Sequence, residues 1–364
     1  MILYNVYFYL YKGIKKDNFT INYFKGNDKI MTNRLSYFDN AKFFLIFLVV
    51  FGHIIRPFID ESDIMLTIYK FVYTFHMPAF ILISGYFAKG FNKKGYVSKI
   101  AKKLILPYLI FQGIYSVYYF AIEKQGASVL DPLDPHWSLW FLVSLFFWNV
   151  FLFGATKLSP KWSLILAFVF GIAVGYLDIV SNYLSLSRTF VFFPLFLIGF
   201  YLKKEHFMFI TKPKIRVIAV LLLTITFVSY FYLDFDYEWL FGSKPYSQFG
   251  DVSTFNAFIR MGFYTLTLIT SLCFLALIPT RHAFFTEWGT RTFYVYLLHG
   301  FIIQYMRNGH TIEWLGDYQS IATLTLLAVL LTTLLSTKTV KEIASPIIEL
   351  KPSHLYNKPF SLNK

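Results

Sequence analysis

Residues 38–58 of the chain read FDNAKFFLIFLVVFGHIIRPF. The stretch is apolar for most of its length, which predicts a helix long enough to cross a membrane. Its ionisable side chains include Lys42 near the start and His53 in the second half. They are eleven residues apart, close to three full turns, so both lie on one side of the helix. An ionisable residue inside a membrane helix is costly to place and indicates a functional site.

The composition extends this interpretation to the whole chain. Of 364 residues, 56% are hydrophobic and 15% are charged, whereas a soluble domain carries about 25% charged residues. Apolar runs separated by short polar clusters recur along the sequence, which is typical of a polytopic α-helical membrane protein. We therefore expect an all-α fold with about ten membrane-spanning helices, at residues 41–59, 65–88, 102–121, 138–156, 162–178, 188–202, 215–233, 255–279, 291–307 and 320–337.

The basic residues gather on one side of these expected helices. When the N-terminus and every second connection are assigned to one face, that face holds 27 of the 34 Lys and Arg residues. Positive charge marks the cytoplasmic side of membrane proteins, so we expect a multi-pass protein of the cell membrane with both termini in the cytoplasm. The net charge of +14 is then a topology signal, aided by anionic membrane lipids. Nucleic-acid binding is not expected.

We expect three segments along the chain: a cytoplasmic N-terminal segment at 1–33, a ten-helix membrane domain at 34–337 and a short cytoplasmic tail at 338–364. The first residues, MILYNVYFYLY, are apolar but short. They have no basic leader and no small-residue cleavage site after them, so they do not resemble a signal peptide. The stretch MTNRLSYFDNAKFF from Met31 reads as a natural beginning, and we hypothesise that translation starts there.

Few ionisable side chains fall within the expected helices. The candidate bases are His53, His76 and His299, because an imidazole can take a proton from a hydroxyl near neutral pH. The sequence has no HExxH, no CxxC and no histidine pair at i, i+4, so no metal site is expected. The basic residues in the outer halves or outer ends of expected helices are Arg56, Lys70, Arg188, Arg260 and Arg307.

Several of these features also have a purely structural interpretation. Lys42 can extend toward lipid headgroups, Asp39 can cap the first helix, and His76 can form a hydrogen bond to a neighbouring helix. The two long outer connections, 122–137 and 234–254, mix aromatic with acidic residues. Such composition suits either an anchor at the membrane interface or a rim that binds sugar rings.

At these positions the sequence resembles the acyltransferase-3 family of integral membrane acyltransferases, most closely its fucose 4-O-acetylase-like branch. The first helix of that family carries an acidic residue, then Arg or Lys, then a histidine eleven positions later. The matching segments here are FDNAKFFLIFLVVFGH with Asp39, Lys42 and His53, FHMPAFILISGYF with His76, WFL from Trp140, and YVYLLHGF with His299.

The resemblance implies transfer of an acyl group, commonly acetyl, from cytoplasmic acyl-CoA to a sugar hydroxyl of a surface polysaccharide or lipid-linked sugar. Acyl-CoA is then a donor substrate, and no bound cofactor is expected. No segment here resembles the extracellular esterase-like domain of some members. The transfer is therefore completed by this chain or by a secreted or membrane-bound glycan-modifying partner. The residues implied are His53 as base or acyl relay, Lys42 and Asp39 for the donor, and His76, Trp140, Arg56, Arg260 and His299 for the cavity and acceptor.

Two other classes stay open on the residues alone. Buried histidines and outer arginines also suit a transporter or flippase of a polysaccharide intermediate or small anion, although no inverted repeat is visible. A regulatory membrane protein that senses a ligand without catalysis is the third class. Comparing surface glycans from cells with and without the gene separates transfer from transport.

Overall fold

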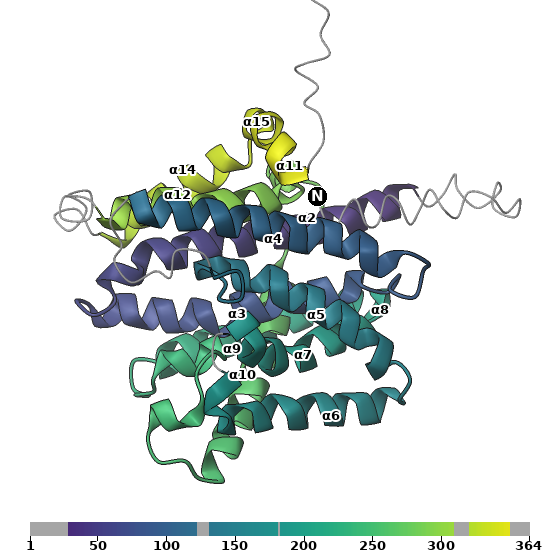
Figure 1. Cartoon of the computed structure of the whole chain (residues 1–364), viewed down its shortest axis with the longest axis vertical. Helices are drawn as coiled ribbons and strands as arrows, with labels where there is room; N and C mark the ends of the chain where they lie inside the picture. Colours follow the sequence, from purple (N-terminus) through teal and green to yellow (C-terminus); the bar gives the residue numbers. More distant parts are fainter. Residues whose placement is uncertain (1–27, 122–130, 181–182, 309–319, 350–364) are drawn as a thin grey trace, which may run out of the picture.

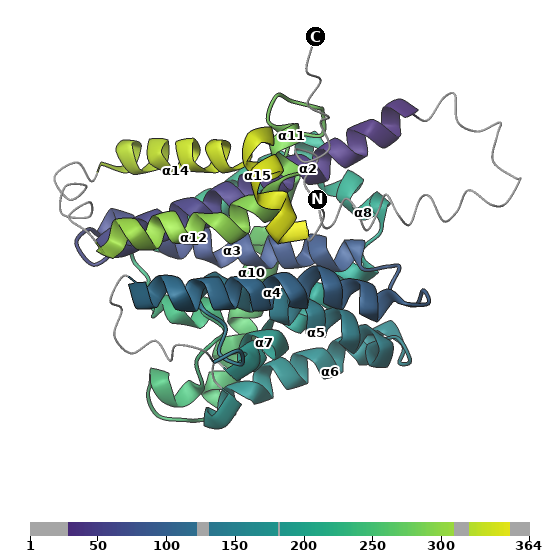
Figure 2. The ribbon, with the colours of Figure 1, turned by 45° about the horizontal axis from the view of Figure 1, so that its top comes forward.

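The structure, a computed structural model, describes residues 28–121, 131–180, 183–308 and 320–349. Side chains are described from Ser36 on, apart from Asn308. Within these ranges the chain is helical and has no strand, so the expected all-α class is confirmed. Most of the long helices run side by side in one bundle (Figure 1; Figure 2). The hypothesis of a start at Met31 concerns residues 1–30, most of which lie outside the described ranges.

A helix lies in each of the ten ranges expected from the sequence. These helices are α2 (Asp28–Ile55), α3 (Asp63–Phe87), α4 (Tyr96–Ala121), α5 (Trp140–Ala155), α6 (Pro160–Ala173), α7 (Leu186–Tyr201), α9 (Pro213–Ser229), α10 (Phe255–Leu277), α12 (Thr292–Asn308) and α14 (Ile321–Leu335). The shorter elements are η1 (Arg56–Phe58), η2 (Trp137–Leu139), η3 (Val174–Tyr176), η4 (Asp178–Val180), η5 (Tyr183–Ser185), α8 (Lys204–Ile210), η6 (Tyr237–Phe241), η7 (Tyr246–Phe249), α11 (Thr286–Gly289) and α15 (Lys338–Glu349).

Six helical segments of the described chain are long and apolar enough to cross a membrane: α2 with η1, α3, α4, η2 with α5, η5 with α7, and α10. A seventh would arise if α14 and α15, bent by 64° at their junction, form one span. By contrast, α9 and α12 have 17 residues each, which is about 26 Å of helix, shorter than the ~30 Å of a bilayer core. The helices fit a multi-pass membrane protein, while the count of ten and the cytoplasmic termini stay predictions.

Glycines bring α3 and α7 together. A Cβ atom added at Gly85 would lie 1.9 Å from the carbonyl oxygen of Phe196, and one at Gly199 would lie 2.1 Å from that of Leu82. Neither distance is compatible with a side chain. Membrane helices use small residues in this way because close approach of the backbones increases van der Waals contact. As α3 also packs along α2, the close crossing fixes where the face of α3 that bears His76 lies.

The two ends of α2 are held by different elements. In its first half, Phe38 packs against Phe207 of α8, with ring centroids 5.1 Å apart. Beyond its other end, the Arg56 guanidinium donates a hydrogen bond of 2.8 Å to the Tyr237 hydroxyl of η6. We refer to these as the Lys42 end and the Arg56 end of the bundle. Because α2 begins at Asp28, Asp39 lies inside the helix, and the interpretation of Asp39 as its cap is wrong.

Candidate functional site

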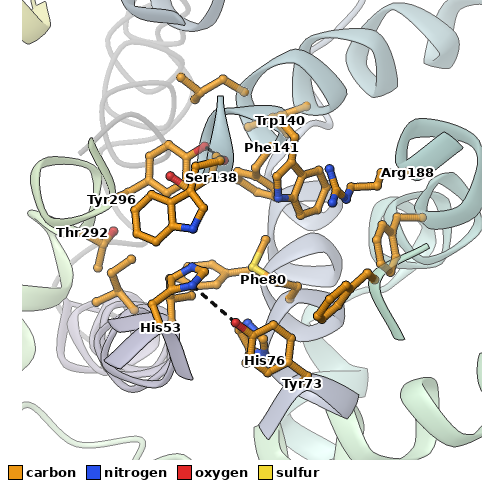
Figure 3. Close-up of a pocket in the computed structure, with 18 of the residues that line it drawn as sticks. His53, Tyr73, His76, Phe80, Ser138, Trp140, Phe141, Arg188, Thr292 and Tyr296 are labelled. Carbon is orange, nitrogen blue, oxygen red and sulfur yellow. Dashed lines mark hydrogen bonds between the residues drawn. The ribbon is translucent and has the colours of Figure 1, made fainter. Parts of the chain in front are cut away.

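A cavity of about 340 Å³ lies between α2, α3, α5, α7 and α12 (Figure 3). Lys42, His53 and Arg56 all line it, so it follows α2 for about 21 Å at 1.5 Å per residue. The lining is largely apolar, which suits an acyl chain. The polar or ionisable side chains that line it are Lys42, His53, Arg56, Tyr69, Tyr73, His76, Ser84, Ser138, Arg188, Thr292, Tyr296 and Arg307.

At one end of the cavity Lys42 forms a buried ion pair. Its Nζ atom lies 2.6 Å from Oδ1 of Asp39, one turn earlier in α2, and the two side chains are 3% and 8% exposed. Lys42 therefore does not extend toward lipid headgroups, and that interpretation is wrong. A Cβ atom on Gly289 would lie 1.9 Å from the Asp39 carbonyl oxygen, so α11 covers this turn of α2. The pair therefore places the N–H groups of the Lys42 ammonium at the cavity, with the positive charge already balanced by Asp39.

His53 lies toward the other end, among aromatic rings. Its ring centroid is 4.3 Å from that of Trp137 and 5.6 Å from that of His299. The Tyr73 hydroxyl lies 3.4 Å from Nδ1 of His53, as Figure 3 shows. When Nδ1 carries the proton and donates to this hydroxyl, the lone pair of Nε2 is available to accept a proton. Gly52 leaves room for this contact, since a Cβ atom there would lie 2.8 Å from the Tyr73 ring.

The other two candidate histidines are held by their own helices. Nδ1 of His76 donates to the carbonyl of Val72, and Nδ1 of His299 donates to the carbonyl of Val295, both at 2.8 Å. A carbonyl only accepts, so in each ring the proton is on Nδ1 and Nε2 is an acceptor. His76 lines the cavity. His299 is fully buried behind it, and within the described part of the chain its Nε2 atom has no hydrogen-bond partner.

Trp137 was not expected at the site, although the connection 122–137, which ends at it, was noted for its aromatic and acidic residues. It lines the cavity with its backbone at φ +44°, a left-handed conformation that is strained for a bulky residue. Gln112 of α4 holds the preceding loop: its amide donates to the carbonyls of Asp131 and Asp134, and its Oε1 accepts from the His136 N–H. Such strain persists only where neighbouring contacts impose it.

Trp140 lines the cavity, as expected, and its ring lies 5.1 Å from the Arg188 guanidinium. Arg188 and Arg307 were noted in the sequence only as basic residues near helix ends, yet both line the cavity. Tyr73 was also missed. A signal for it existed, because it precedes His76 by three residues and therefore shares one face of a helix with it.

Arg260 does not line the cavity. Its Nη1 atom donates a 2.8 Å hydrogen bond to the Trp239 carbonyl, and its guanidinium lies 5.0 Å from the Trp239 ring. The expected cavity contact of Arg260 is therefore not made; the residue instead holds the connection at 234–254. That connection still reaches the cavity through Leu240 and Phe241. Trp239 itself is buried and stacks on Phe263.

Comparison with known proteins identifies the family of this chain. The family model described as an acyltransferase domain, acyltransferase-3, matches residues 35–337. The chain belongs to the acyltransferase-3 family. The resemblance stated from the sequence is thereby confirmed, and His53, Lys42, His76, Trp140 and the buried His299 all lie within the matched range.

Two relatives of this acyltransferase-3 chain are nodulation proteins. Nodulation protein NolL of Sinorhizobium fredii (strain NBRC 101917 / NGR234) is 31% identical over 183 residues, 46% of this chain and 48% of that protein. Nodulation protein NolL of Mesorhizobium japonicum is 31% identical over 123 residues, 30% and 33% of the two chains. The matches thus span about half, or less, of these relatives. No solved structure matches the chain.

Proposed function

We propose that this family member is a membrane O-acyltransferase that moves an acyl group, acetyl in the simplest case, from cytoplasmic acyl-CoA to a hydroxyl of a cell-surface glycan sugar. One observation carries the proposal: Lys42 and His53 line the same cavity, three turns apart on α2. The basic residues expected on the cytoplasmic side would attract the phosphates of CoA. The apolar lining between Lys42 and His53 suits the acyl-pantetheine arm.

In this proposal, His53 is the base. Nδ1 donates to the Tyr73 hydroxyl, so Nε2 takes the proton of the acceptor hydroxyl as its oxygen attacks the thioester carbonyl. The new carbon–oxygen bond forms, the carbon–sulfur bond breaks, and the imidazolium returns the proton to the departing CoA thiolate. In the relay version, Nε2 attacks the thioester carbonyl first, the carbon–sulfur bond breaks, and CoA leaves as its thiolate. The acyl-imidazolium holds the acyl group until the acceptor hydroxyl attacks it; the carbon–nitrogen bond then breaks and the hydroxyl proton passes to the thiolate. Both versions need an unprotonated Nε2.

The buried Lys42–Asp39 pair suits donor binding in a particular way. Because Asp39 already balances the charge of Lys42, the ammonium group would form a hydrogen bond to the acyl-CoA at the Lys42 end of the cavity. It would not act there as a free cation. Lysine also lacks the fork of two N–H groups with which arginine grips a phosphate. The CoA phosphates would then contact other basic residues, and Lys42 would contact the pantetheine arm.

Acyl transfer can be measured with the purified protein in lipid nanodiscs, using labelled acetyl-CoA and a surface-glycan extract. His53→Ala should lower transfer by about 10²- to 10⁴-fold, the usual contribution of a general base. The matched control is His282→Ala, which removes an exposed histidine that does not line the cavity and should leave transfer unchanged. Full activity of His53→Ala would refute the role of His53.

Mass spectrometry of surface glycans from cells with and without the gene tests the activity itself. Loss of an acetyl mass supports transfer from acetyl-CoA, and loss of a succinyl mass supports transfer from succinyl-CoA. Unchanged glycans together with lost export of an intact polymer would support transport instead. Adding membranes of the same cells to the purified protein shows whether a glycan-modifying partner completes the transfer.

A further inference from the structure

We infer that the acceptor carries a negative charge, a phosphate or a carboxylate, next to the hydroxyl that receives the acyl group. This inference rests on the proposed function and names its acceptor class. It comes from three arginines, Arg56, Arg188 and Arg307, which line the cavity away from Lys42. Arg307 contacts the backbone of His53, Arg56 follows His53 by three residues, and Arg188 lies beside Trp140.

The two ends of the cavity differ in charge balance. At the Lys42 end the ammonium is neutralised by Asp39 at 2.6 Å. Among the described residues, no carboxylate forms an ion pair with Arg188 or Arg307. Arg188 contacts the ring of Trp140. Cations in a largely apolar cavity are costly unless an anion balances them, so this end of the cavity is suited to a bound anion.

Arg307 lies next to the base. Its Nη2 atom donates a 2.5 Å hydrogen bond to the backbone carbonyl of His53, while its Nε atom is buried without a hydrogen-bond partner among the described residues. Arg56 follows His53 by three residues, less than one helical turn. An anion held by these guanidinium groups would therefore lie within about one sugar ring of the hydroxyl that loses its proton to His53.

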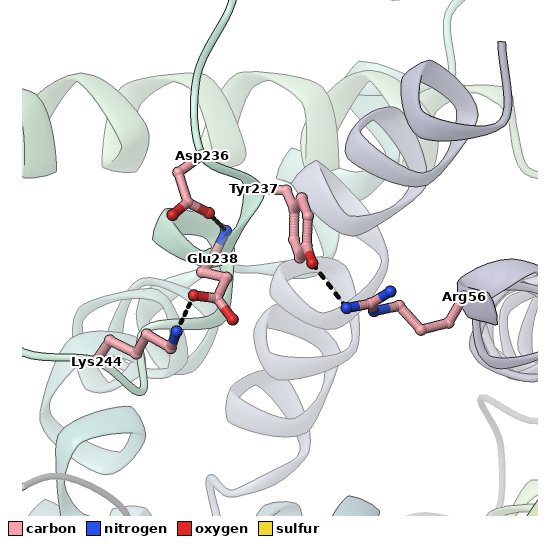
Figure 4. Close-up of polar contacts among 5 residues, drawn as sticks. All are labelled: Arg56, Asp236, Tyr237, Glu238 and Lys244. Atoms are coloured by element: carbon pink, nitrogen blue, oxygen red, sulfur yellow. Dashed lines mark hydrogen bonds and ion pairs between the residues drawn. The ribbon is translucent and has the colours of Figure 1, made fainter. Parts of the chain in front are cut away.

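Two acids next to Tyr237, the hydrogen-bond partner of Arg56, are committed to other groups (Figure 4). Asp236 accepts a 2.8 Å hydrogen bond from the backbone N–H of Glu238, and the Glu238 carboxylate pairs with Lys244. Arg56 donates to the Tyr237 hydroxyl, and its only ion pair in the described chain is with Asp60, at 3.7 Å and 77% exposed. A carboxylate so exposed is readily displaced, since such pairs contribute about 0–1 kcal/mol.

Guanidinium groups recognise phosphate and carboxylate through paired hydrogen bonds. Two sources would present such an anion to the cavity: a uronic-acid carboxylate on the sugar ring, or the phosphate that links a sugar to a lipid carrier. A neutral sugar would leave Arg188 and Arg307 without an ion-pair partner among the described residues. The charge would thus select the acceptor as well as place its hydroxyl beside His53.

The test measures binding first, so that it does not depend on turnover. His53→Ala protein in nanodiscs is titrated with octyl β-glucuronide, octyl β-glucoside and glucose 1-phosphate. The anionic probes should bind at least about tenfold more tightly than the glucoside, the scale of a charge-assisted contact. A stronger preference for the glucuronide assigns the anion to a sugar carboxylate, and a stronger preference for glucose 1-phosphate assigns it to a phosphate linkage. Equal affinity for all three probes would overturn the inference.

Three variants show whether the arginines are responsible. In the same background, Arg188→Gln should abolish the preference, and Arg307→Lys should weaken it while keeping the charge. Lys244→Ala is the matched control, because it removes a positive charge from the connection at 234–254, outside the cavity lining. A preference that survives Arg188→Gln in correctly folded protein, judged by gel filtration, refutes the role of Arg188.

Turnover by the protein with its native His53 separates this inference from the proposed function. Transfer from acetyl-CoA that ignores acceptor charge would leave the function standing and the inference refuted. Anion binding without any acyl transfer would do the reverse. A preference for succinyl-CoA over acetyl-CoA on the neutral glucoside, lost in Arg188→Gln, would assign the anion to the donor's acyl group and overturn the acceptor assignment.

Discussion

The ion pair between Asp39 and Lys42 makes a quantitative prediction about stability. Lys42→Met removes the ammonium but leaves the Asp39 carboxylate buried, with no other ion-pair partner among the described residues. Breaking a buried pair by removing one partner costs about 3–5 kcal/mol, because the remaining charge is uncompensated. With side chains only 3% and 8% exposed, solvent cannot reduce this cost much. At roughly 2 °C per kcal/mol, the expected fall in melting temperature is about 6–10 °C.

The double variant Asp39→Asn/Lys42→Met removes both charges. It should recover most of the lost stability, because replacing a complete buried pair by uncharged groups is often nearly neutral. Thermal unfolding in detergent, followed by intrinsic fluorescence, measures both changes. The reasoning is wrong if Lys42→Met melts within about 1 °C of the unmodified protein, or if the double variant is no more stable than the single one. If Lys42 also contacts the donor, the double variant will keep a raised KM for acyl-CoA.

Two further predictions concern the wall that carries Trp137. A Cβ atom at Gly300 would lie 2.2 Å from the Trp137 ring. Gly300→Ala should therefore displace that ring from His53 and lower kcat at least about tenfold, a typical cost of misplacement near a reacting group. An unchanged kcat would contradict the packing of Trp137 on Gly300. Burial lowers the pKa of His136 below its ordinary value of 6.5, against the opposing effect of Asp134, so the unfolded chain binds the proton more readily. Stability should fall as the pH drops below about 6.5, and His136→Asn should show a smaller fall in a melting series from pH 7.5 to 5.5; identical slopes would contradict this.

The sequence alone was sufficient to locate the helices. Each expected range contains a helix because long apolar runs specify helices by local composition, independent of what they pack against. It also set the spacing of Lys42 and His53, since a helix places residues eleven apart on one face wherever it lies. The family followed from motifs of the same local kind.

Local sequence patterns gave wrong predictions for the first residue of α2 and for the residue that Arg260 contacts. Asp39 seemed to cap α2 because the apolar run begins just after it, but the helix begins at Asp28 within polar sequence. Arg260 seemed a cavity residue because it lies inside an apolar helix, but it packs against Trp239. Neither the start of α2 nor the contact of Arg260 can be read from the residues next to Asp39 or Arg260 in the sequence.

The surroundings of His53 were decided only by the tertiary structure. Trp137 comes from η2, Tyr73 from α3, and Arg307 from 254 positions further along the chain. Their meeting depends on which helix faces come together, and that is set by contacts between distant segments, such as the backbone crossing at Gly85. Hydrophobic periodicity identifies the buried face of a helix but not the helix opposite. The base was therefore visible in the sequence, whereas the arginines around it became visible only once the helices were packed.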